Sequence, residues 1–283
     1  MQMLISNRSF MLTRLLALFL IGLLLPITAS AIEIDDLYIA EVLVNDESAP
    51  QLRLGSRAGL LQVLVRVSGH IRIEDHPVIR TAMHRPSDYY YQYSYESSEH
   101  KLFVDGKEVP AKLLRLHFEP SAIARLLRDA NLPVWGSNRP GVLFWIVTSK
   151  DTDRRILTET DTGEILRGLV AQADRRGLPV NFPILDLEDK AKISAAEVWG
   201  SFLDRIERAS QRYDPDGVVT ARIQEKSGRW SAKWSFLLGG EWRSIESAAF
   251  SASDLAHKLV DLVVDELASR YALDSSRETV ALT

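Results

Sequence analysis

The stretch VLFWIVT, residues 142–148, determines the fold that we expect for this chain. It contains no charged residue and no Gly or Pro. An uninterrupted apolar run of this length is typical of a strand that is buried on both faces, as in the interior of a parallel sheet. Parallel strands need crossover connections, which are usually helices. The sequence therefore predicts helices and further strands after residue 148.

Helix signals follow in the expected places. Asp161, with Glu164 three residues later, is suited to cap a helix that Gly177 would end. Ser194 and Glu197 have the spacing of a capping box, which predicts the start of a second helix, ending near residue 213. The face of this second helix that we expect to be buried carries Val198, Phe202, Ile206 and Ala209.

The remaining segments complete an α/β (α+β) fold. A strand is expected at 178–185, between the two helices, and the turn sequence DPDG at 214–217 precedes three more strands. These strands are expected at residues 218–224, 229–238 and 241–250. A last helix is expected over 253–271. The order predicts an α/β unit with two parallel strands, an antiparallel three-strand meander and a C-terminal helix.

The residues before 132 predict a separate, smaller α+β unit. Its elements are expected to be a strand at 37–44, helices at 48–68 and 77–83, strands from Tyr89 and at 112–118, and a helix at 120–130. The segment LPVWGSNRPG, residues 132–141, has the composition of a linker. The expected organisation is a signal peptide at 1–31, an N-terminal domain at 32–131, that linker, a C-terminal domain at 142–273 and a tail at 274–283. The end of the tail, 278–283, has the composition of a strand.

The first 31 residues have the pattern of a secretory signal peptide. Arg8 and Arg14 precede an apolar run at 15–27, and small residues end at Ala31. The apolar run is shorter than the ~20 residues that a membrane-spanning helix needs. We expect cleavage after Ala31, a periplasmic location, and no stable membrane insertion of the mature chain.

Composition excludes several classes of function. The chain has no cysteine, so disulfides, thiolate zinc sites and cysteine nucleophiles are excluded. Without the signal peptide it carries 32 basic and 38 acidic residues, a balance that argues against nucleic acid as a partner. Neither an H-E-x-x-H pair nor a nucleophile-elbow serine is present, and we assign no catalytic residue.

Two acidic loops are the main candidates for a functional site. Asp186, Glu188 and Asp189 follow one expected parallel strand, and Asp151 and Asp153 follow another. The carboxyl ends of parallel strands are common ligand sites, and carboxylates from two loops would suit Ca²⁺ or Mg²⁺. Alternatively, neighbouring basic residues neutralise these carboxylates, which then only cap and solvate the loops. We favour this second interpretation and expect no cofactor. The neighbouring basic residues are Arg154, Arg155, Lys190 and Lys192.

A tyrosine-rich segment is the second candidate for binding. Tyr89, Tyr91, Tyr93 and Tyr95 alternate along the chain, so a regular strand would place them all on one face. Such a face could stack on sugars or peptides, with Tyr89, Tyr91 and Tyr93 as the candidate residues. Aromatic residues on one face of a strand also commonly pack against a helix or a neighbouring strand.

Several strings together carry a resemblance to a known family. They are GLLQVLVRVSG at 59–69, RGLP at 176–179, DLED at 186–189, VWG at 198–200 and ASQRY at 209–213. In this order, behind a signal peptide, they resemble a bacterial domain-of-unknown-function family of exported proteins. The resemblance covers most of the mature chain. It implies no reaction, and no residue inherits a role from it.

Three functional hypotheses follow. The leading one is a soluble periplasmic protein that acts as a non-catalytic binding or adaptor module in cell-envelope assembly or maintenance, with an envelope or periplasmic protein as partner. The second is a metal-dependent hydrolase or metal-binding protein that uses the acidic loops around Asp151 and Asp186. The third is a glycan- or peptide-binding protein that uses the tyrosine strand. The oligomeric state stays open.

Overall fold

Strand β6 (Val142–Lys150) lies within a six-stranded sheet, as its apolar run predicts. The computed structural model describes residues 32–33, 36–104, 106–136, 138–150 and 153–280. Side chains alternate between the two faces of a strand, so Phe144 and Trp145 enter different hydrophobic clusters. Both side chains are fully buried. The prediction of a strand covered on both faces is confirmed.

The six-stranded sheet has the order β11-β10-β9-β6-β7, and β8 also pairs with β6. The strands that join β6 are β7 (Asp153–Ile156), β8 (Val180–Asn181), β9 (Gly217–Lys226), β10 (Arg229–Leu238) and β11 (Glu241–Ala249). Strands β8 and β9 are parallel to β6, and β9, β10 and β11 form the predicted antiparallel meander. The hairpin residues Gly228 and Gly240 have positive φ, at 72° and 82°, a conformation that glycine adopts without strain.

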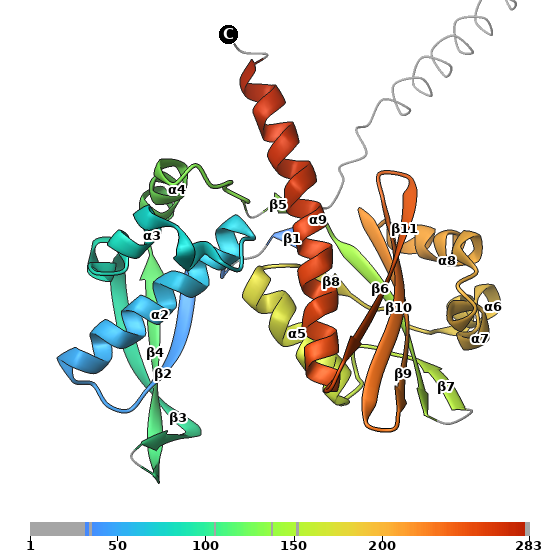
Figure 1. Ribbon diagram of the computed structural model, residues 1–283, viewed down its shortest axis with the longest axis horizontal. Coiled ribbons are helices and arrows are strands. Elements are labelled where there is room, and N and C mark those ends of the chain that lie inside the picture. The colour runs from blue at the N-terminus through green and yellow to red at the C-terminus, as the bar shows by residue number, and fades with distance from the viewer. Residues whose placement is uncertain (1–31, 34–35, 105, 137, 151–152, 281–283) are drawn as a thin grey trace, which may run out of the picture. The chain divides into compact units, whose positions relative to one another are not determined.

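Helices cover this sheet on both faces (Figure 1). One face is covered by α5 (Glu164–Arg176) and α9 (Ala252–Val280), whose side chains share a cluster with Phe144. The other face is covered, near Trp145, by α6 (Leu187–Lys192), α7 (Ala195–Trp199) and α8 (Leu203–Ser210). The predicted mixture of helices and sheets, with a meander and a C-terminal helix, is confirmed.

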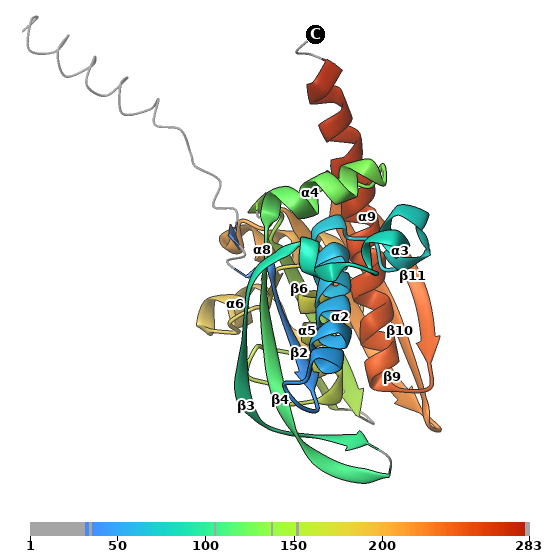
Figure 2. The same ribbon diagram turned by 90° about the vertical axis from the view of Figure 1, so that its left-hand side faces the viewer.

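The N-terminal segment builds a three-stranded antiparallel sheet of order β2-β4-β3 with α2 against one face (Figures 1 and 2). Its elements are β2 (Ile39–Val44), α2 (Ala49–Ser68), α3 (Pro77–Ala82), β3 (Tyr90–Val104), β4 (Lys107–Phe118) and α4 (Pro120–Asp129). Gly55 and Gly59 allow helix α2 to lie close to β4. A Cβ on Gly55 would come within 2.5 Å of Leu114, and one on Gly59 within 2.8 Å of Leu116. Figure 2 shows the β3–β4 hairpin extending past the end of α2.

Two buried arginines connect α2 with α5 and α9. Arg139 belongs to β5 (Asn138–Arg139), which pairs with β1 (Ile32–Glu33). Its guanidinium donates to the carbonyls of Arg66 and Gly177, each at 2.7 Å, and of Trp135 at 2.9 Å. Arg66 and Gly177 lie at the C-terminal ends of α2 and α5, where the helix dipoles place negative partial charge. Backbone carbonyls therefore solvate the positive charge of this buried guanidinium.

Arg176 makes the second connection. Its guanidinium is fully buried, donates to the carbonyl of Gly69 at 2.6 Å, and forms ion pairs with Asp261 and Asp265 of α9. Residues 32–283 cluster as one compact unit, within which these contacts join the two sheets' helices. The boundaries of the predicted N-terminal domain, linker and C-terminal domain stay a prediction.

The strand expected at 178–185 is much shorter than predicted. Only Val180 and Asn181 pair with β6, as β8. Pro179 and Pro183 on either side cannot donate to a sheet, and Leu185 has a φ of 55°, which is incompatible with a strand. The parallel direction was predicted correctly, and the length was wrong because the prolines end the ladder.

The helix expected from 194 to 213 is broken into two. The capping box is confirmed, because Ser194 accepts a bond from the amide of Glu197 and Glu197 accepts one from the amide of Ser194. The helix then ends at Trp199, and Ser201 has a φ of 57°. Phe202, expected on the buried face, is 56% exposed. The chain turns at Gly200-Ser201 before α8 resumes, which moves Phe202 out of the apolar stripe.

Two smaller expectations were also wrong. Asp161 does not cap α5, whose N-cap is Gly163; its carboxylate instead accepts a bond from the amide of Thr158 at 2.8 Å. The strand expected at 278–283 is part of α9 as far as Val280. None of the described helices is long and apolar enough to span a membrane. The predicted signal peptide, 1–31, lies outside the described residues.

Candidate functional site

The acidic stretch 186–189 lies at the start of α6, and Asp186 is the residue that begins this helix. Its carboxylate accepts a hydrogen bond from the amide of Asp189 at 3.0 Å, the geometry of an N-cap. Leu185 precedes it in a left-handed conformation, which turns the chain sharply out of the 182–184 segment. The sequence Leu-Asp-Leu-Glu-Asp therefore forms a tight, capped turn and not an open loop.

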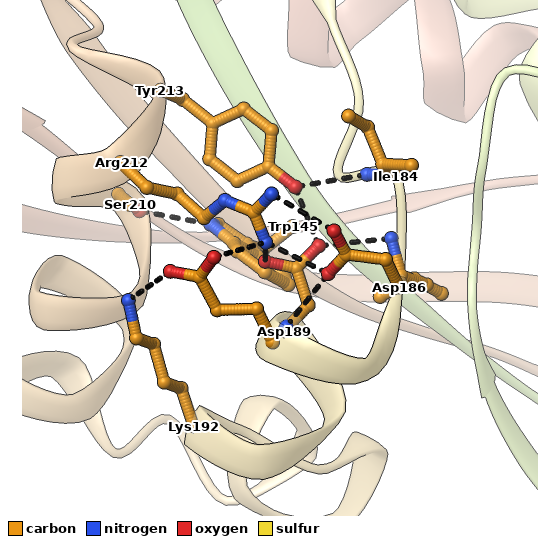
Figure 3. A network of polar contacts seen from close by, with 10 residues as sticks. Trp145, Ile184, Asp186, Asp189, Lys192, Ser210, Arg212 and Tyr213 are labelled. Atoms are coloured by element: carbon orange, nitrogen blue, oxygen red, sulfur yellow. Dashed lines mark hydrogen bonds and ion pairs between the residues drawn. The ribbon is translucent and has the colours of Figure 1, made fainter.

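Arg212 and Tyr213, in the 3-10 turn Gln211–Tyr213 that follows α8, contact this acidic turn (Figure 3). The guanidinium of Arg212 binds both carboxylate oxygens of Asp186, at 2.7 and 2.9 Å, and one oxygen of Asp189 at 3.1 Å. The hydroxyl of Tyr213 donates to Asp189 at 2.5 Å and accepts from the amide of Ile184 at 3.0 Å. Neither Arg212 nor Tyr213 was among the residues that the sequence singled out as a site. Both stand in the string ASQRY, which was noted only as part of the family resemblance.

Asp189 is the centre of this network. Its carboxylate is fully buried and is satisfied by three donors, which are the amide of Leu185 at 2.9 Å, Arg212 and Tyr213. A buried charge is stable only when it is paired and hydrogen-bonded, and here both conditions are met. Glu188, by contrast, is exposed: its carboxylate pairs with Lys192 at 2.7 Å and lies 3.6 Å from Arg212, at the edge of the network.

The network rests on the core strand β6. The indole nitrogen of Trp145 donates to the hydroxyl of Ser210 at 2.8 Å, at the end of α8. The ring of Trp145 also meets that of Tyr213 edge-on, with centroids 6.4 Å apart. Figure 3 shows this arrangement, in which β6, α6 and the end of α8 meet at one point. The turn at 184–189 is therefore fixed to the buried sheet through Tyr213.

The electrostatics hold these groups in fixed protonation states. Hydrogen bonds from Arg212 hold the pKa of Asp186 well below its usual range, and Asp186 in turn raises the pKa of Arg212. Burial, together with the hydrogen bond to Asp189, raises the pKa of Tyr213 to about 12. General acid–base catalysis needs a group whose pKa lies near the working pH. Asp186 stays ionised and Tyr213 neutral at pH 7, so the arrangement is suited to holding the turn.

Replacing Asp186 by asparagine tests this coupling through pH. An asparagine can still cap α6, so the variant removes mainly the charge that faces Arg212. Because folding lowers the pKa of Asp186, its contribution is fully present above the unfolded value of 3.8 and is lost as the pH falls below it. We expect wild type to be more stable than Asp186→Asn at pH 7, and the difference to shrink below pH 3.8. Urea unfolding between pH 7 and pH 2.5 measures it.

The exposed Glu99→Gln variant is the control for this experiment. A difference between wild type and Asp186→Asn that stays constant across the pH range would contradict the assigned role of the Asp186 charge.

The second acidic loop does not join this cluster. Asp153 pairs with Lys150 at the far end of β6, whereas Asn181, just before the acidic turn, pairs with Leu143. At about 3.3 Å per residue, these positions on β6 are roughly 20 Å apart along the strand. Asp151 lies outside the described residues. Within the described ranges, no group of three or more His, Asp or Glu side chains is arranged to hold a metal ion.

The tyrosines do not share one face, because β3 carries a bulge. Tyr90 pairs with Phe118 and Gln92 with His117, so Tyr91 is an extra residue in the ladder. Tyr93 and Tyr95 consequently stand opposite Leu116 and Leu114 on the face that carries α2, as does Tyr90 opposite Phe118. Tyr91, 64% exposed, lies with its ring 6.1 Å from that of His117 on the opposite face.

Of the three tyrosines proposed as binding residues, Tyr89 packs against the core beneath α2, Tyr93 is 46% exposed, and Tyr91 alone among these three turns to the outer face. The prediction that the alternating tyrosines share one face was therefore wrong, because the bulge shifts the alternation by one residue.

Comparison with known proteins gives a family for part of the chain. Residues 31–136 match the model of a family described as a domain of unknown function, DUF8605, which confirms the resemblance to a family of that kind. Of the strings that carried the resemblance, 59–69 lies inside the matched range and the four strings between 176 and 213 lie beyond it. No curated protein matches the chain. Among solved structures, the chain is similar to lipoprotein GNA1162 from Neisseria meningitidis, at 21% identity and a TM-score of 0.28, over 46% of this chain and 96% of that one.

Proposed function

We propose that this chain is a non-catalytic binding or adaptor module of the cell envelope, and that it contacts a protein partner through the turn at 184–187. The observation that carries the proposal is the exposure of two aliphatic side chains on this turn, Ile184 at 69% and Leu187 at 87%. Both precede Asp189, whose buried carboxylate binds the turn, in the sequence. The polar network thus holds a turn whose outward side chains are apolar.

The exposure of these two side chains indicates a binding surface because the backbone that carries them is held in a fixed conformation. Single exposed aliphatic residues are common on protein surfaces and need no explanation. Here, however, the backbone amides of Ile184 and Leu185 are both bonded to the network, and Leu187 is the first residue of a capped helix. A side chain on a pre-ordered backbone loses less conformational entropy on binding than one on a mobile loop. Two aliphatic anchors on a fixed turn are therefore well suited to insert into an apolar pocket of a partner.

The surroundings of the anchors fit an interface. Glu188 and Lys192 form an exposed ion pair on α6 beside Leu187, and Lys190 lies on the same short helix. Apolar anchors surrounded by polar residues are the usual anatomy of a protein–protein contact. The envelope location rests on the first 31 residues, which have the pattern of a signal peptide.

Site-specific crosslinking in cells tests the proposal. A photoreactive amino acid at Leu187 should give an adduct with an envelope protein, whereas the same amino acid at Arg57, exposed on α2, should not. We also expect the double variant Ile184→Ser/Leu187→Ser to lose the partner without a change in the unfolding midpoint, because both side chains are largely exposed.

Recovery of only the uncrosslinked chain from position 187, under all growth conditions tried, would contradict the proposed contact. A fall in the unfolding midpoint of the double variant would show that these side chains serve the fold and not a partner.

A further inference from the structure

The second face of the six-stranded sheet is only partly covered by helices. Val218 and Leu237 pack with Trp145 in the cluster beneath α7 and α8. Farther along the same strands, the face is open and forms a groove of about 360 Å³. Its lining residues are Arg222, Gln224, Ser231, Ala232, Lys233, Glu246, Ser247 and Ala248. This volume is in the range of small-molecule sites, roughly 300–1,000 Å³.

The charges in this groove are not balanced. Lys233 of β10 stands directly opposite Arg222 of β9, and it stands opposite Glu246 of β11 on its other side. Like charges directly opposite each other on neighbouring strands are destabilising. The carboxylate of Glu246 lies 4.0 Å from Lys233, a long distance for an ion pair, and is 77% exposed. It therefore neutralises the two cations weakly.

Arg222 differs from three other arginines around the sheet. Arg212 binds two aspartates, Arg243 pairs with Glu266, and Arg154 stacks on Trp199. Arg222 is half-buried, yet within the described ranges it has no ion pair, hydrogen bond or aromatic partner. A partly desolvated guanidinium without an anion is an unfavourable arrangement that a bound anion would correct.

The neighbours of Arg222 supply the remaining polar groups. Gln224 and Ser231 stand opposite each other, two residues along their strands from Arg222 and Lys233. Side chains two residues apart point to the same face of a sheet. The four side chains thus form a block about 5 Å wide across the strands and about 7 Å long. It contains two cations, one amide and one hydroxyl. A guanidinium fork and an ammonium group recognise the oxygens of carboxylates and phosphates.

We propose that this groove is a binding site for a small oxyanion-bearing ligand, a carboxylate or a phosphate, held by Arg222 and Lys233 with hydrogen bonds from Gln224 and Ser231. Glu246 limits the net positive charge of the site, which favours a single anionic group over a polyanion. The site is separate from the 184–187 turn of the proposed function, so either can fail without the other.

Titration of the purified chain with inorganic phosphate and, separately, with acetate, followed through amide chemical shifts, tests the site. We expect saturable shifts centred on residues 222–224 and 231–233. Replacing Arg222 or Lys233 by glutamine should weaken binding by about tenfold, the effect of removing one charge-assisted hydrogen bond. Arg57→Gln removes the same charge from the exposed face of α2 and should leave the affinity unchanged. The stronger of the two anions shows whether carboxylate or phosphate is preferred.

Thermal unfolding without ligand separates binding from folding. Because Arg222 and Lys233 repel each other, Arg222→Gln should unfold at the same or a higher temperature than wild type in a buffer without phosphate or carboxylates. Equal affinities of wild type, Arg222→Gln and Lys233→Gln for both anions, or an equal loss of affinity in Arg57→Gln, would overturn the site.

Discussion

Replacing Asp189 by alanine is expected to lower the free energy of unfolding by about 3–5 kcal/mol, the usual loss when one partner of a buried ion pair is removed. The carboxylate is fully buried, and its removal leaves the amide of Leu185 and the hydroxyl of Tyr213 without their acceptor. Arg212 would lose its buried anion and keep its ion pairs with Asp186 and Glu188. Urea unfolding of the purified chain at pH 7 measures the change through the midpoint of the transition.

Glu188→Ala is the matched control, because it removes an exposed carboxylate one residue away, which pairs with Lys192 and contacts Arg212 only at 3.6 Å. We expect little change in its midpoint, as is usual for surface ion pairs. If both variants were destabilised equally, the loss would reflect the net charge of α6, and the buried network would not be the source of stability.

Replacing Arg139 by lysine is expected to destabilise the chain by about 2–6 kcal/mol, because two buried carbonyls lose their donor at about 1–3 kcal/mol each. Lysine preserves the charge but lacks the planar fork that reaches Arg66, Trp135 and Gly177 at the same time. Burial and the positive charge of Arg66 already lower the pKa of Arg139, so the site tolerates a cation only while the carbonyls surround it. Thermal unfolding should show a loss of about 2–4 °C per kcal/mol for a chain of this size.

Arg53→Lys, at an exposed position of α2, is the control for this substitution and should leave the melting temperature unchanged. An Arg139→Lys variant as stable as wild type would show that the positive charge alone, without the fork, is sufficient between the ends of α2 and α5.

Much of the fold was predictable because the strongest signals are local. The apolar run at 142–148, the Gly177 and Gly69 helix ends, and the Gly239-Gly240 hairpin each specify a conformation from a few adjacent residues. Two of the failures occur where the chain departs from regular geometry by one residue. The bulge at Tyr91 and the turn at Gly200-Ser201 both shift a hydrophobic pattern without interrupting it, so periodicity alone gave one face where there are two.

The candidate site was predictable in position but not in content. The density of carboxylates at 186–189 marked the correct turn, and the interpretation in which basic residues neutralise them was the favoured one. Of the adjacent basic residues, Lys192 does pair with Glu188, but the residue that neutralises Asp186 and Asp189 is Arg212, which is far along the chain. Only the return of α8 to the sheet brings it there. Burial of Asp189 beneath Tyr213 is equally a tertiary property, with no pattern of its own in the sequence.

The irregular outer strand of the small sheet bears on how a partner can approach it. Strand β3 has register shifts after Tyr90 and between Ser97 and Lys101. The second shift contains the polar residues Glu99 and His100 and is followed by Lys101. An incoming strand needs an uninterrupted row of amides and carbonyls to extend a sheet. Bulges interrupt this row, and charged side chains disfavour pairing along it. Strand addition at this border is therefore disfavoured, which protects the long hairpin from self-association and leaves recognition at this sheet to side chains.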